Sequence, residues 1–338
     1  MRLSKKIVSV LTAAALVASL TACGSGSNSA TSGSKSGSDN SGSKVYHVGI
    51  CQLVEHEALD AATKGFQDAL KEKLGEENVE FDVQNAQGES TNCSTICNGF
   101  VTDNVDLIMA NATGSLQAAV SSTNSIPILG TSVTDYATAL NISDWSGKTG
   151  TNVSGTSDLA PIDQQEDMIL EILPDVKNVG IAYCSSEPNS AFQAQRMEEA
   201  LKADVIEYKE YTASDSNEIQ SVITTACDEV DAIYIPTDNT MASSVETIKN
   251  VVIPAGVPLF AGEEGICKGC GVATLSISYY DLGYQTGLMA YDILVNNADP
   301  ATMEIKFAPN VTKKYNTTNA TELNISIPDS YEAIVVEE

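Results

Sequence analysis

Short runs of β-branched residues alternate with longer amphipathic stretches along most of the chain. Val48-Gly49-Ile50 is typical of a buried strand, and apolar residues at helical spacing follow it until Gly75. These residues are Leu59, Ala62, Phe66, Leu70 and Leu74. Further strand cores are expected at 79–81, 105–108 and 126–129. The alternation predicts an α/β protein with parallel sheets.

The same pattern returns in the second half of the chain. The strand at 179–181 and the helix containing 197–201 repeat 48–50 and 66–70 at a constant offset of 131 residues. Two further strands, 230–233 and 257–260, echo 105–108 and 126–129 in the same order. Three matches in one order predict two similar doubly wound parallel-sheet lobes, joined by a hinge with a ligand cleft between them.

The last third of the chain can be assigned in two ways. The helical stretch after the strand 272–277 is either one more helix of the second lobe, or it crosses back to the first. In the second case residues 325–336 return to the second lobe. We expect lobe 1 to comprise 45–157 and 281–302, and lobe 2 to comprise 158–280 and 303–338.

The amino-terminal segment has the features of a lipoprotein signal. Arg2, Lys5 and Lys6 precede the apolar stretch 7–20, which is too short to span a bilayer comfortably. Leu20-Thr21-Ala22-Cys23 resembles the bacterial lipobox, so we expect cleavage after residue 22 and diacylation of Cys23. An ordinary secreted protein with a chance cysteine is the alternative. Two acyl chains would anchor the protein to the extracytoplasmic face of the cell membrane.

A Gly/Ser-rich segment at 24–44 separates Cys23 from the predicted lobes. As a flexible coil it would reach roughly 25 Å, so it reads as a tether. The formal net charge of −27 argues against nucleic acid as a partner, because phosphate binding needs clustered Lys and Arg. The cysteine pairs Cys93/Cys97 and Cys267/Cys270 read as small buried residues or local disulfides rather than as a metal site, and we expect no cofactor.

Loops at the carboxyl ends of the predicted strands carry hydroxyls, amides and carboxylates. The helix start at Thr113, Gly114 and Ser115 suits a carboxylate, while Asp238 or Glu55 could pair with an ammonium group. An amino acid satisfies both ends. Helix capping is the alternative role for Thr113, Ser115 and Asp238. On sequence alone, His56 reads as a solvated loop residue.

Several segments carry a family resemblance. They are "VGICQLVEHEALDAATKGF", "FDVQNAQGE", "VTDNVDLIMANAT", "ILPDVKNVGIAYCSSEPNS", "VDAIYIPTDNT" and "YYDLGYQTG". The chain from about Val45 to Ser330 resembles the substrate-binding lipoproteins of ABC importers, and is similar to the group that includes tryptophan and other aromatic amino acid binders. The resemblance implies a type I periplasmic-binding-protein fold, a monomer that closes on a small solute, and delivery to an ABC permease.

The resemblance also implies a set of ligand contacts. They are Gln52, Glu55, His56, Thr113, Gly114, Ser115, Thr134, Asp135, Glu187, Asn189, Ser190, Thr237, Asp238, Asn239, Tyr280 and Asp281. Tyr279 or Tyr280 could stack on an aromatic ligand. The chain departs from the family pattern at "GEEGICKGCG", beside the expected cleft, which leaves the side-chain end of the ligand open.

An enzyme is the less favoured reading of the chain. "SGKTG" at 146–150 ends like a phosphate-binding loop, but Ile142 stands where the leading glycine belongs. No G-x-S-x-G elbow and no triad order of the histidines is present. Two alternatives remain open at this point: a lipoprotein that senses its ligand for a signalling partner, and a binder of a sugar or nucleoside.

Overall fold

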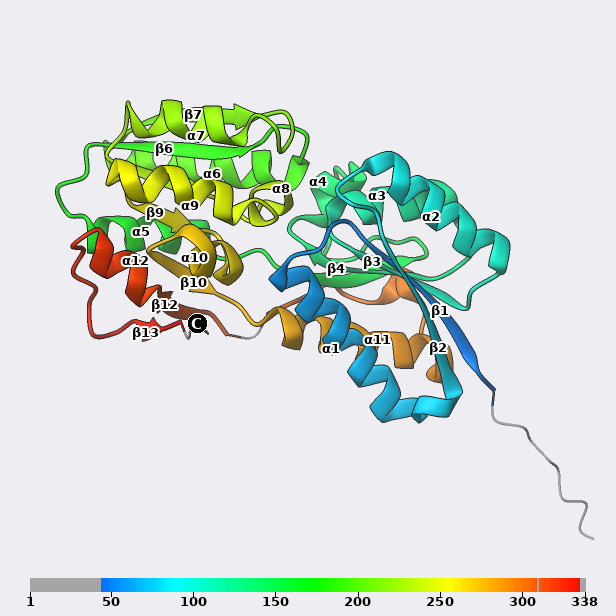
Figure 1. Cartoon of the computed structure of the whole chain (residues 1–338). Helices are drawn as coiled ribbons and strands as arrows, with labels where there is room; N and C mark the ends of the chain where they lie inside the picture. The colour runs from blue at the N-terminus through cyan, green and yellow to red at the C-terminus, as the bar shows by residue number, and fades with distance from the viewer. Residues whose placement is uncertain (1–43, 309, 335–338) are drawn as a thin grey trace, which may run out of the picture. The chain divides into compact units, whose positions relative to one another are not determined.

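The computed structural model describes residues 44–308 and 310–334. The expected signal peptide, Cys23 and nearly all of the tether lie outside these residues. No helix within the described ranges is both long and apolar enough to cross a membrane. The described residues contain two β-sheets, each flanked by helices (Figure 1).

Sheet A contains only parallel pairs, in the order β11-β5-β4-β3-β1-β2. Its strands are β1 (Tyr46–Gln52), β2 (Val79–Asn85), β3 (Leu107–Asn111), β4 (Ile128–Val133), β5 (Val153–Ser157) and β11 (Lys306–Phe307). The central strands β3, β4 and β5 are buried at every position, as expected for strands covered on both faces. The first half of the sequence repeat therefore folds as a doubly wound sheet.

Sheet B has the order β13-β12-β10-β9-β8-β6-β7, and only the β10–β12 pair is antiparallel. Its strands are β6 (Asn178–Cys184), β7 (Glu207–Ala213), β8 (Ala232–Ile235), β9 (Leu259–Ala261), β10 (Ala273–Ser276), β12 (Thr312–Tyr315) and β13 (Glu332–Ala333). The order β9-β8-β6-β7 matches β4-β3-β1-β2 of sheet A, so the repeat in the sequence is a repeat of topology.

Helices cover both faces of each sheet. Those associated with sheet A are α1 (Glu57–Leu74), η1 (Glu76–Asn78), α2 (Ser90–Asp103), α3 (Thr113–Ser122), α4 (Tyr136–Leu140), α11 (Tyr279–Asn296) and η2 (Pro300–Thr302). Those associated with sheet B are α5 (Ile162–Ile172), α6 (Pro188–Ala203), α7 (Ile219–Cys227), α8 (Asn239–Ala242), α9 (Val245–Ala255), α10 (Glu264–Cys270) and α12 (Thr317–Glu322). Each sheet has one buried apolar cluster on each face. We call sheet A with its helices lobe 1, and sheet B with its helices lobe 2.

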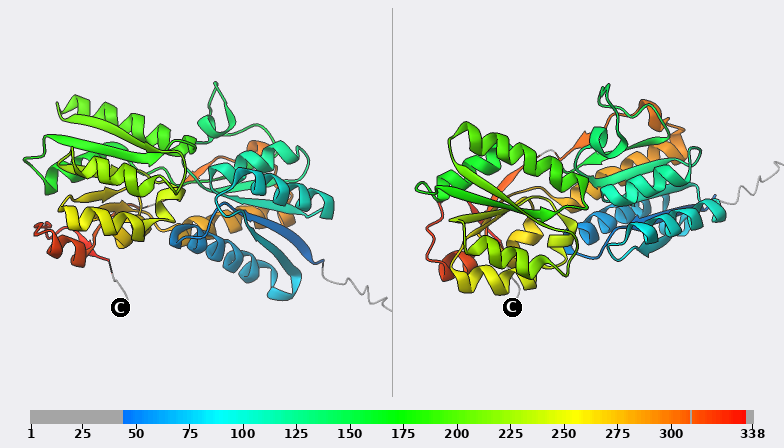
Figure 2. Two further views of the ribbon diagram at one scale, coloured as in Figure 1. Left: turned by 45° about the horizontal axis from the view of Figure 1, so that its top comes forward. Right: turned by 90° about the horizontal axis from the view of Figure 1, so that it is seen from above.

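Helix α11 belongs to lobe 1, which decides between the two assignments of the last third of the chain. It packs along α1, and Figure 2 shows the two helices side by side in both views. The packing is close because small residues meet there: a Cβ added to Gly283 would lie 1.9 Å from the backbone oxygen of Ala62, and one added to Gly65 would lie 2.1 Å from that of Tyr280. Such distances allow no side chain at these two positions.

The chain passes between the lobes three times. The crossings lie between β5 and α5, between β10 and α11, and between β11 and β12. The last crossing comes later than expected at Met303, because Lys306 and Phe307 still pair with Thr156 and Ser157 of sheet A. Three crossings form the hinge between the lobes.

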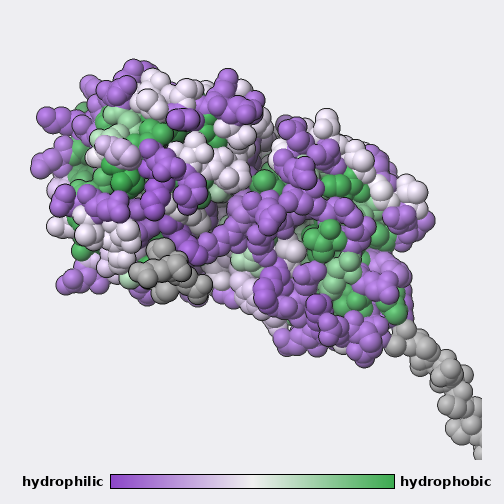
Figure 3. All heavy atoms as spheres, in the orientation of Figure 1, coloured by the Kyte–Doolittle hydropathy of each residue, from purple (hydrophilic) through white to green (hydrophobic). Residues whose placement is uncertain are grey.

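The surface is strongly polar. On the face shown in Figure 3, hydrophilic side chains dominate and hydrophobic ones stand in small groups. This distribution agrees with the net charge of −27, since most of the acidic residues of the chain face water. The acidic residues buried inside the molecule are few, and three of them meet at one place.

Candidate ligand-binding site

The carboxyl ends of strands from both lobes meet at one cavity. Loops after β1, β4, β6, β8 and β9 contribute to its wall, together with the first crossing and the start of α11. Its lining residues are His56, Leu59, Ser132, Thr134, Asp158, Asn189, Thr237, Asp238, Asn239, Ala242, Glu263 and Tyr279. Because parallel strands end at the same edge of a sheet, the repeat brings equivalent loops of the two lobes face to face.

The cavity is nearly closed in this structure. Its volume is about 10 Å³, which is room for about one water molecule. A larger hollow of about 590 Å³ adjoins it and shares Asn189 and Asn239 with it. The hollow is lined by both lobes, with Leu53 and Gly114 from lobe 1 and Pro188 from lobe 2. An amino acid could enter the inner cavity only if the lobes separate.

Asp238 is the most deeply placed carboxylate of lobe 2, with 1 % of its surface exposed. One oxygen accepts a hydrogen bond from the Met241 N–H (2.8 Å), which caps α8, and the other accepts one from the Cys184 N–H at the end of β6 (2.7 Å). Burial, and then the charge of Glu187, raise the pKa of Asp238 to about 7. The capping role considered for Asp238 is therefore real, and the carboxylate also faces the cavity.

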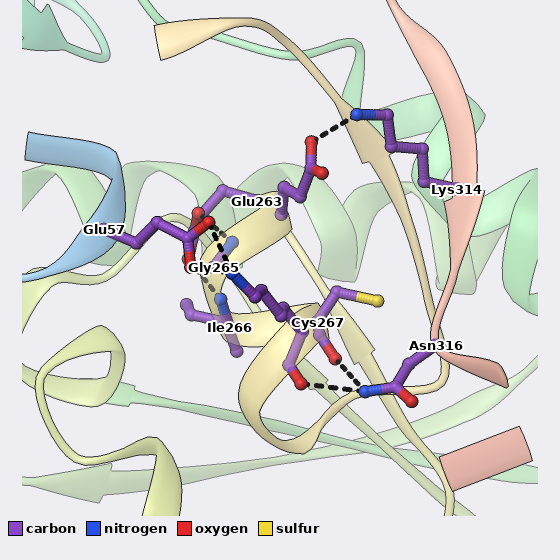
Figure 4. Close-up of polar contacts among 9 residues, drawn as sticks. Glu57, Glu263, Gly265, Ile266, Cys267, Lys314 and Asn316 are labelled. Carbon is purple, nitrogen blue, oxygen red and sulfur yellow. Dashed lines mark hydrogen bonds and ion pairs between the residues drawn. The ribbon is translucent and has the colours of Figure 1, made fainter. Parts of the chain in front are cut away.

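Glu263 also lines the cavity, at the start of α10, where Figure 4 shows its carboxylate turned toward the backbone of Gly265 and Ile266. It accepts the N–H of Gly265 at 2.6 Å and that of Ile266 at 2.5 Å. Burial raises the pKa of Glu263 to about 7. The departure from the family pattern at "GEEGICKGCG" thus places a second buried carboxylate at the site.

Asp158, in the first crossing between the lobes, is the third buried carboxylate of the cavity. It accepts hydrogen bonds from the Thr134 hydroxyl (3.0 Å) and the Tyr279 hydroxyl (2.8 Å), and burial raises its pKa. Sequence reasoning missed Asp158 as a site residue, because it lies in a connection between lobes and not in a loop matched by the repeat. Tyr279 connects this carboxylate to the start of α11.

Two buried hydroxyl groups at the ends of neighbouring strands have no hydrogen-bond partner among the described residues. They are Thr113 Oγ1, at the first position of α3, and Ser132 Oγ, at the next-to-last position of β4 and on the cavity wall. The two strands are adjacent, since Asn111 of β3 pairs with Thr131 of β4. Leaving a buried hydroxyl unpaired costs roughly 1–3 kcal/mol, which a ligand acceptor would recover.

Six residues expected from the sequence line the cavity: His56, Thr134, Asn189, Thr237, Asp238 and Asn239. His56 is half-buried rather than solvated, and its Nε2 atom lies 3.2 Å from Asn239 Oδ1 of the other lobe. Thr113 lies at the helix start as expected, and Gly114 lines the outer hollow.

Other expected residues lie elsewhere, with their polar atoms engaged by the protein. Ser115 Oγ lies 3.6 Å from the Sγ atoms of Cys51 and of Cys93 in the lobe 1 core, and Asp135 caps α4 through the Thr138 N–H. Gln52 accepts from Thr63 and donates to Asp60 within lobe 1, and Ser190 is buried beside the Thr237 carbonyl.

Glu55 and Asp281 are exposed and line other hollows, and Tyr280 donates its hydroxyl to Asp68 outside the cavity. Glu187 lines the outer hollow and accepts hydrogen bonds from the backbone at the start of α8. Cys267 and Cys270 are buried free thiols of α10.

Comparison with known proteins shows the family of this chain. Residues 47–337 match the family model described as ABC transporter substrate binding protein. The chain belongs to this family. ABC transporter substrate binding proteins are not enzymes: they bind their ligand outside the cytoplasm without transforming it.

Two relatives of this substrate-binding protein carry ligand names. A tyrosine-binding protein of Clostridioides difficile is 38 % identical over 253 residues, which are 74 % of this chain and 73 % of that protein. A solved structure from Streptococcus pneumonia, in complex with L-Trp, has a TM-score of 0.81 and 31 % identity, and the match covers 85 % of this chain and 97 % of that one.

A third relative is described as ligand-free and open. This substrate binding protein of Clostridium difficile, which has adhesive properties, is 34 % identical, and the match covers 87 % of this chain and all of that one. Its TM-score is 0.66. The two structures are about equally identical to this chain, at 31 % and 34 %, although their TM-scores differ.

Proposed function

We propose that this substrate-binding protein captures an aromatic amino acid between its lobes and delivers it to an ABC permease. The observation that carries the proposal is the polarity of the cavity. Buried carboxylates stand on the lobe 2 side and at the first crossing, and the Ser132 hydroxyl, which has no partner among the described residues, stands on the lobe 1 side. The two charged ends of an amino acid match this polarity in one direction.

The ammonium group is assigned to Asp238 and Glu263. Burial raises the pKa of both carboxyl groups to about 7, and the charge of Glu187 adds to this effect at Asp238. Each of their four oxygens already accepts one backbone N–H, which leaves a second lone pair on every oxygen for the ligand. An ammonium group would return both side chains to the charged form.

The carboxylate group is assigned to the start of α3 and the end of β4. Ser132 Oγ and Thr113 Oγ1 have no partner within 44–308 and 310–334, and the first N–H groups of the ten-residue helix α3 add its positive end. Ser132 adopts φ of +54°, a conformation that is uncommon for a residue other than glycine. This backbone strain is reasonable at a site where the hydroxyl must point in one direction.

The aromatic class of ligand is supported by the relatives that bind tyrosine and L-Trp. Hinge closure is supported by the higher TM-score against the L-Trp complex than against the open, ligand-free relative, and by the small volume of the inner cavity. A diacylated Cys23 followed by the Gly/Ser tether would keep the lobes close to a permease in the same membrane.

Calorimetric titration with four ligands tests the assignment of the two ends. L-Tyrosine and L-tryptophan have both charged groups, tyramine lacks the carboxylate, and 3-(4-hydroxyphenyl)propionate lacks the ammonium group. We expect each truncated ligand to bind at least about a hundredfold more weakly than L-tyrosine, since a buried partner is left without its charge.

The variant Ser132→Ala separates the two ends. Loss of a hydrogen bond to a charged group should weaken L-tyrosine binding by roughly ten- to a hundredfold. Binding of tyramine should change little, because tyramine has no carboxylate for Ser132 to hold. Equal weakening of both ligands would overturn the orientation, and no binding of either aromatic amino acid would overturn the ligand class.

A further inference from the structure

Glu187 is a buried carboxylate that holds neighbouring polar groups of lobe 2 in place. It accepts hydrogen bonds from the Asn189 side chain (3.1 Å), from the N–H (3.1 Å) and Nδ2 (2.7 Å) of Asn239, and from the N–H (2.8 Å) and hydroxyl (2.7 Å) of Thr240. A carboxylate has about four acceptor sites, so these donors saturate it. Although the family resemblance placed Glu187 among the ligand contacts, no acceptor site remains for a ligand.

The consequence is a fixed orientation of the Asn239 side chain. A carboxylate only accepts, so the Asn239 atom 2.7 Å from Glu187 must be the Nδ2 donor. The Asn239 Oδ1 atom then faces the other way, toward lobe 1, where His56 Nε2 lies at 3.2 Å. The histidine must therefore donate from Nε2, because Oδ1 can only accept.

This hydrogen bond joins the two lobes at the cavity wall. His56 is the residue before α1 in lobe 1, and Asn239 is the first residue of α8 in lobe 2. Asn239 lines both the inner cavity and the outer hollow, so the His56–Asn239 bond lies where these two spaces meet. A second connection between the lobes, the Glu57–Lys268 ion pair (3.0 Å), is exposed to solvent and contributes little.

We propose that the His56–Asn239 hydrogen bond is the latch of the closed state, with Glu187 as its positioning residue, so that loss of this bond weakens ligand binding. The proposal rests on the proposed function, because closure of the lobes is measured through the affinity for the ligand. Opening the lobes would separate His56 from Asn239 and expose it to water, and its pKa would then return toward that of an ordinary histidine.

Ligand affinity should also depend on pH, and the surroundings of His56 give the direction of this effect. Burial lowers the pKa of His56 in the closed state, while the Asn239 bond and the charges of Glu187 and Asp60 oppose this effect. Closing the lobes at a pH below about 6.5 thus requires loss of a proton, and affinity falls with acidification. The effect between pH 7.5 and 5.5 is up to about tenfold.

Other carboxyl groups of the cavity also respond to pH. Asp158, Asp238 and Glu263 face the same space, and their pKa values are raised by burial. The pH dependence of ligand binding in the wild-type protein therefore contains contributions from several titrating groups. His56→Gln isolates the latch, since a glutamine amide can donate to Asn239 but does not titrate in this range.

The experiment compares L-tyrosine binding at pH 7.5 and 5.5 for wild type, His56→Gln and the control Glu57→Gln. The control removes the exposed ion pair between the lobes and leaves the latch in place. We expect acidification to weaken wild type and control by the same factor, with a severalfold smaller loss in His56→Gln. The same factor in all three proteins would refute the latch and leave the ligand assignment standing.

A double-mutant cycle with His56→Ala and Asn239→Ala completes the test. If the two side chains act through one bond, the double variant should bind L-tyrosine about as weakly as the weaker single variant. Additive losses would show that each contacts the ligand independently, and would overturn the latch.

If L-tyrosine and L-tryptophan do not bind at all, the proposed function fails, and small-angle scattering still decides on the latch. In that case unliganded His56→Ala should have a larger radius of gyration than wild type at pH 7.5, and equal radii would refute the latch.

Discussion

Replacing Asp238 by Ala should damage the fold as well as ligand binding. The carboxylate holds two backbone N–H groups, that of Met241 at the start of α8 and that of Cys184 at the end of β6. Loss of an N-cap costs about 1 kcal/mol, and an unpaired buried N–H costs roughly 1–3 kcal/mol. We therefore expect the free energy of unfolding of lobe 2 to fall by about 2–4 kcal/mol.

Thermal unfolding of the chain without its signal peptide measures this loss, and Asp135→Ala is the matched control. Asp135 also caps a short helix, but it holds only the Thr138 N–H and lies partly in solvent. At roughly 2–4 °C per kcal/mol for a lobe of this size, the midpoint should fall by roughly 5–15 °C in Asp238→Ala and by only a few degrees in the control. Equal midpoints for the two variants would show that Asp238 does not support β6.

The loss of ligand affinity must be separated from this loss of stability. At a temperature where both proteins are folded, Asp238→Ala should weaken L-tyrosine binding by at least about tenfold, since a charge-assisted partner of the ammonium group is missing. Binding of 3-(4-hydroxyphenyl)propionate, which has no ammonium group, should not weaken. If both ligands lose affinity equally, Asp238 acts only through the fold.

Three further predictions follow from single features of the chain. The pKa values of Asp238 and Glu263 are about 7, and an ammonium group favours their charged forms, so L-tyrosine binding at pH 7 should release protons. The binding enthalpy measured by calorimetry should then depend on the ionisation enthalpy of the buffer. An enthalpy that is the same in all buffers would contradict the ammonium assignment. Gly283→Ala should destabilise lobe 1 by roughly 1–3 kcal/mol or more, because its Cβ would meet the Ala62 carbonyl, whereas Gly99→Ala in α2, with open space around it, should be neutral or stabilising in the same melts. Cys23→Ser should move the protein from the membrane fraction to the medium or periplasm, and retention in the membrane would contradict the lipid anchor.

Much of the architecture could be predicted from local patterns in the sequence. Strand cores such as 48–50 and 179–181 lie inside β1 and β6, and the repeat at an offset of 131 residues corresponds to the matching strand order of the two sheets. This works because hydrophobic periodicity reports burial, and burial in a parallel sheet needs helices on both faces. Since parallel strands end at one edge, even the loops that bear Asp238 and Thr134 could be assigned to the cleft.

Only the tertiary structure decided which side chains of those loops face the ligand. Tyr279 and Tyr280 are neighbours in the sequence, yet Tyr279 bonds Asp158 at the cavity and Tyr280 bonds Asp68 outside it, because successive residues of a helix point about 100° apart. Thr113 and Ser115 differ in the same way. The Thr113 hydroxyl has no partner among the described residues, whereas the Ser115 hydroxyl lies against a thiol of the lobe 1 core. The roles of Asp158, Glu263 and the His56–Asn239 bond depend on the packing of one lobe against the other, and no periodicity within a single element carries that information.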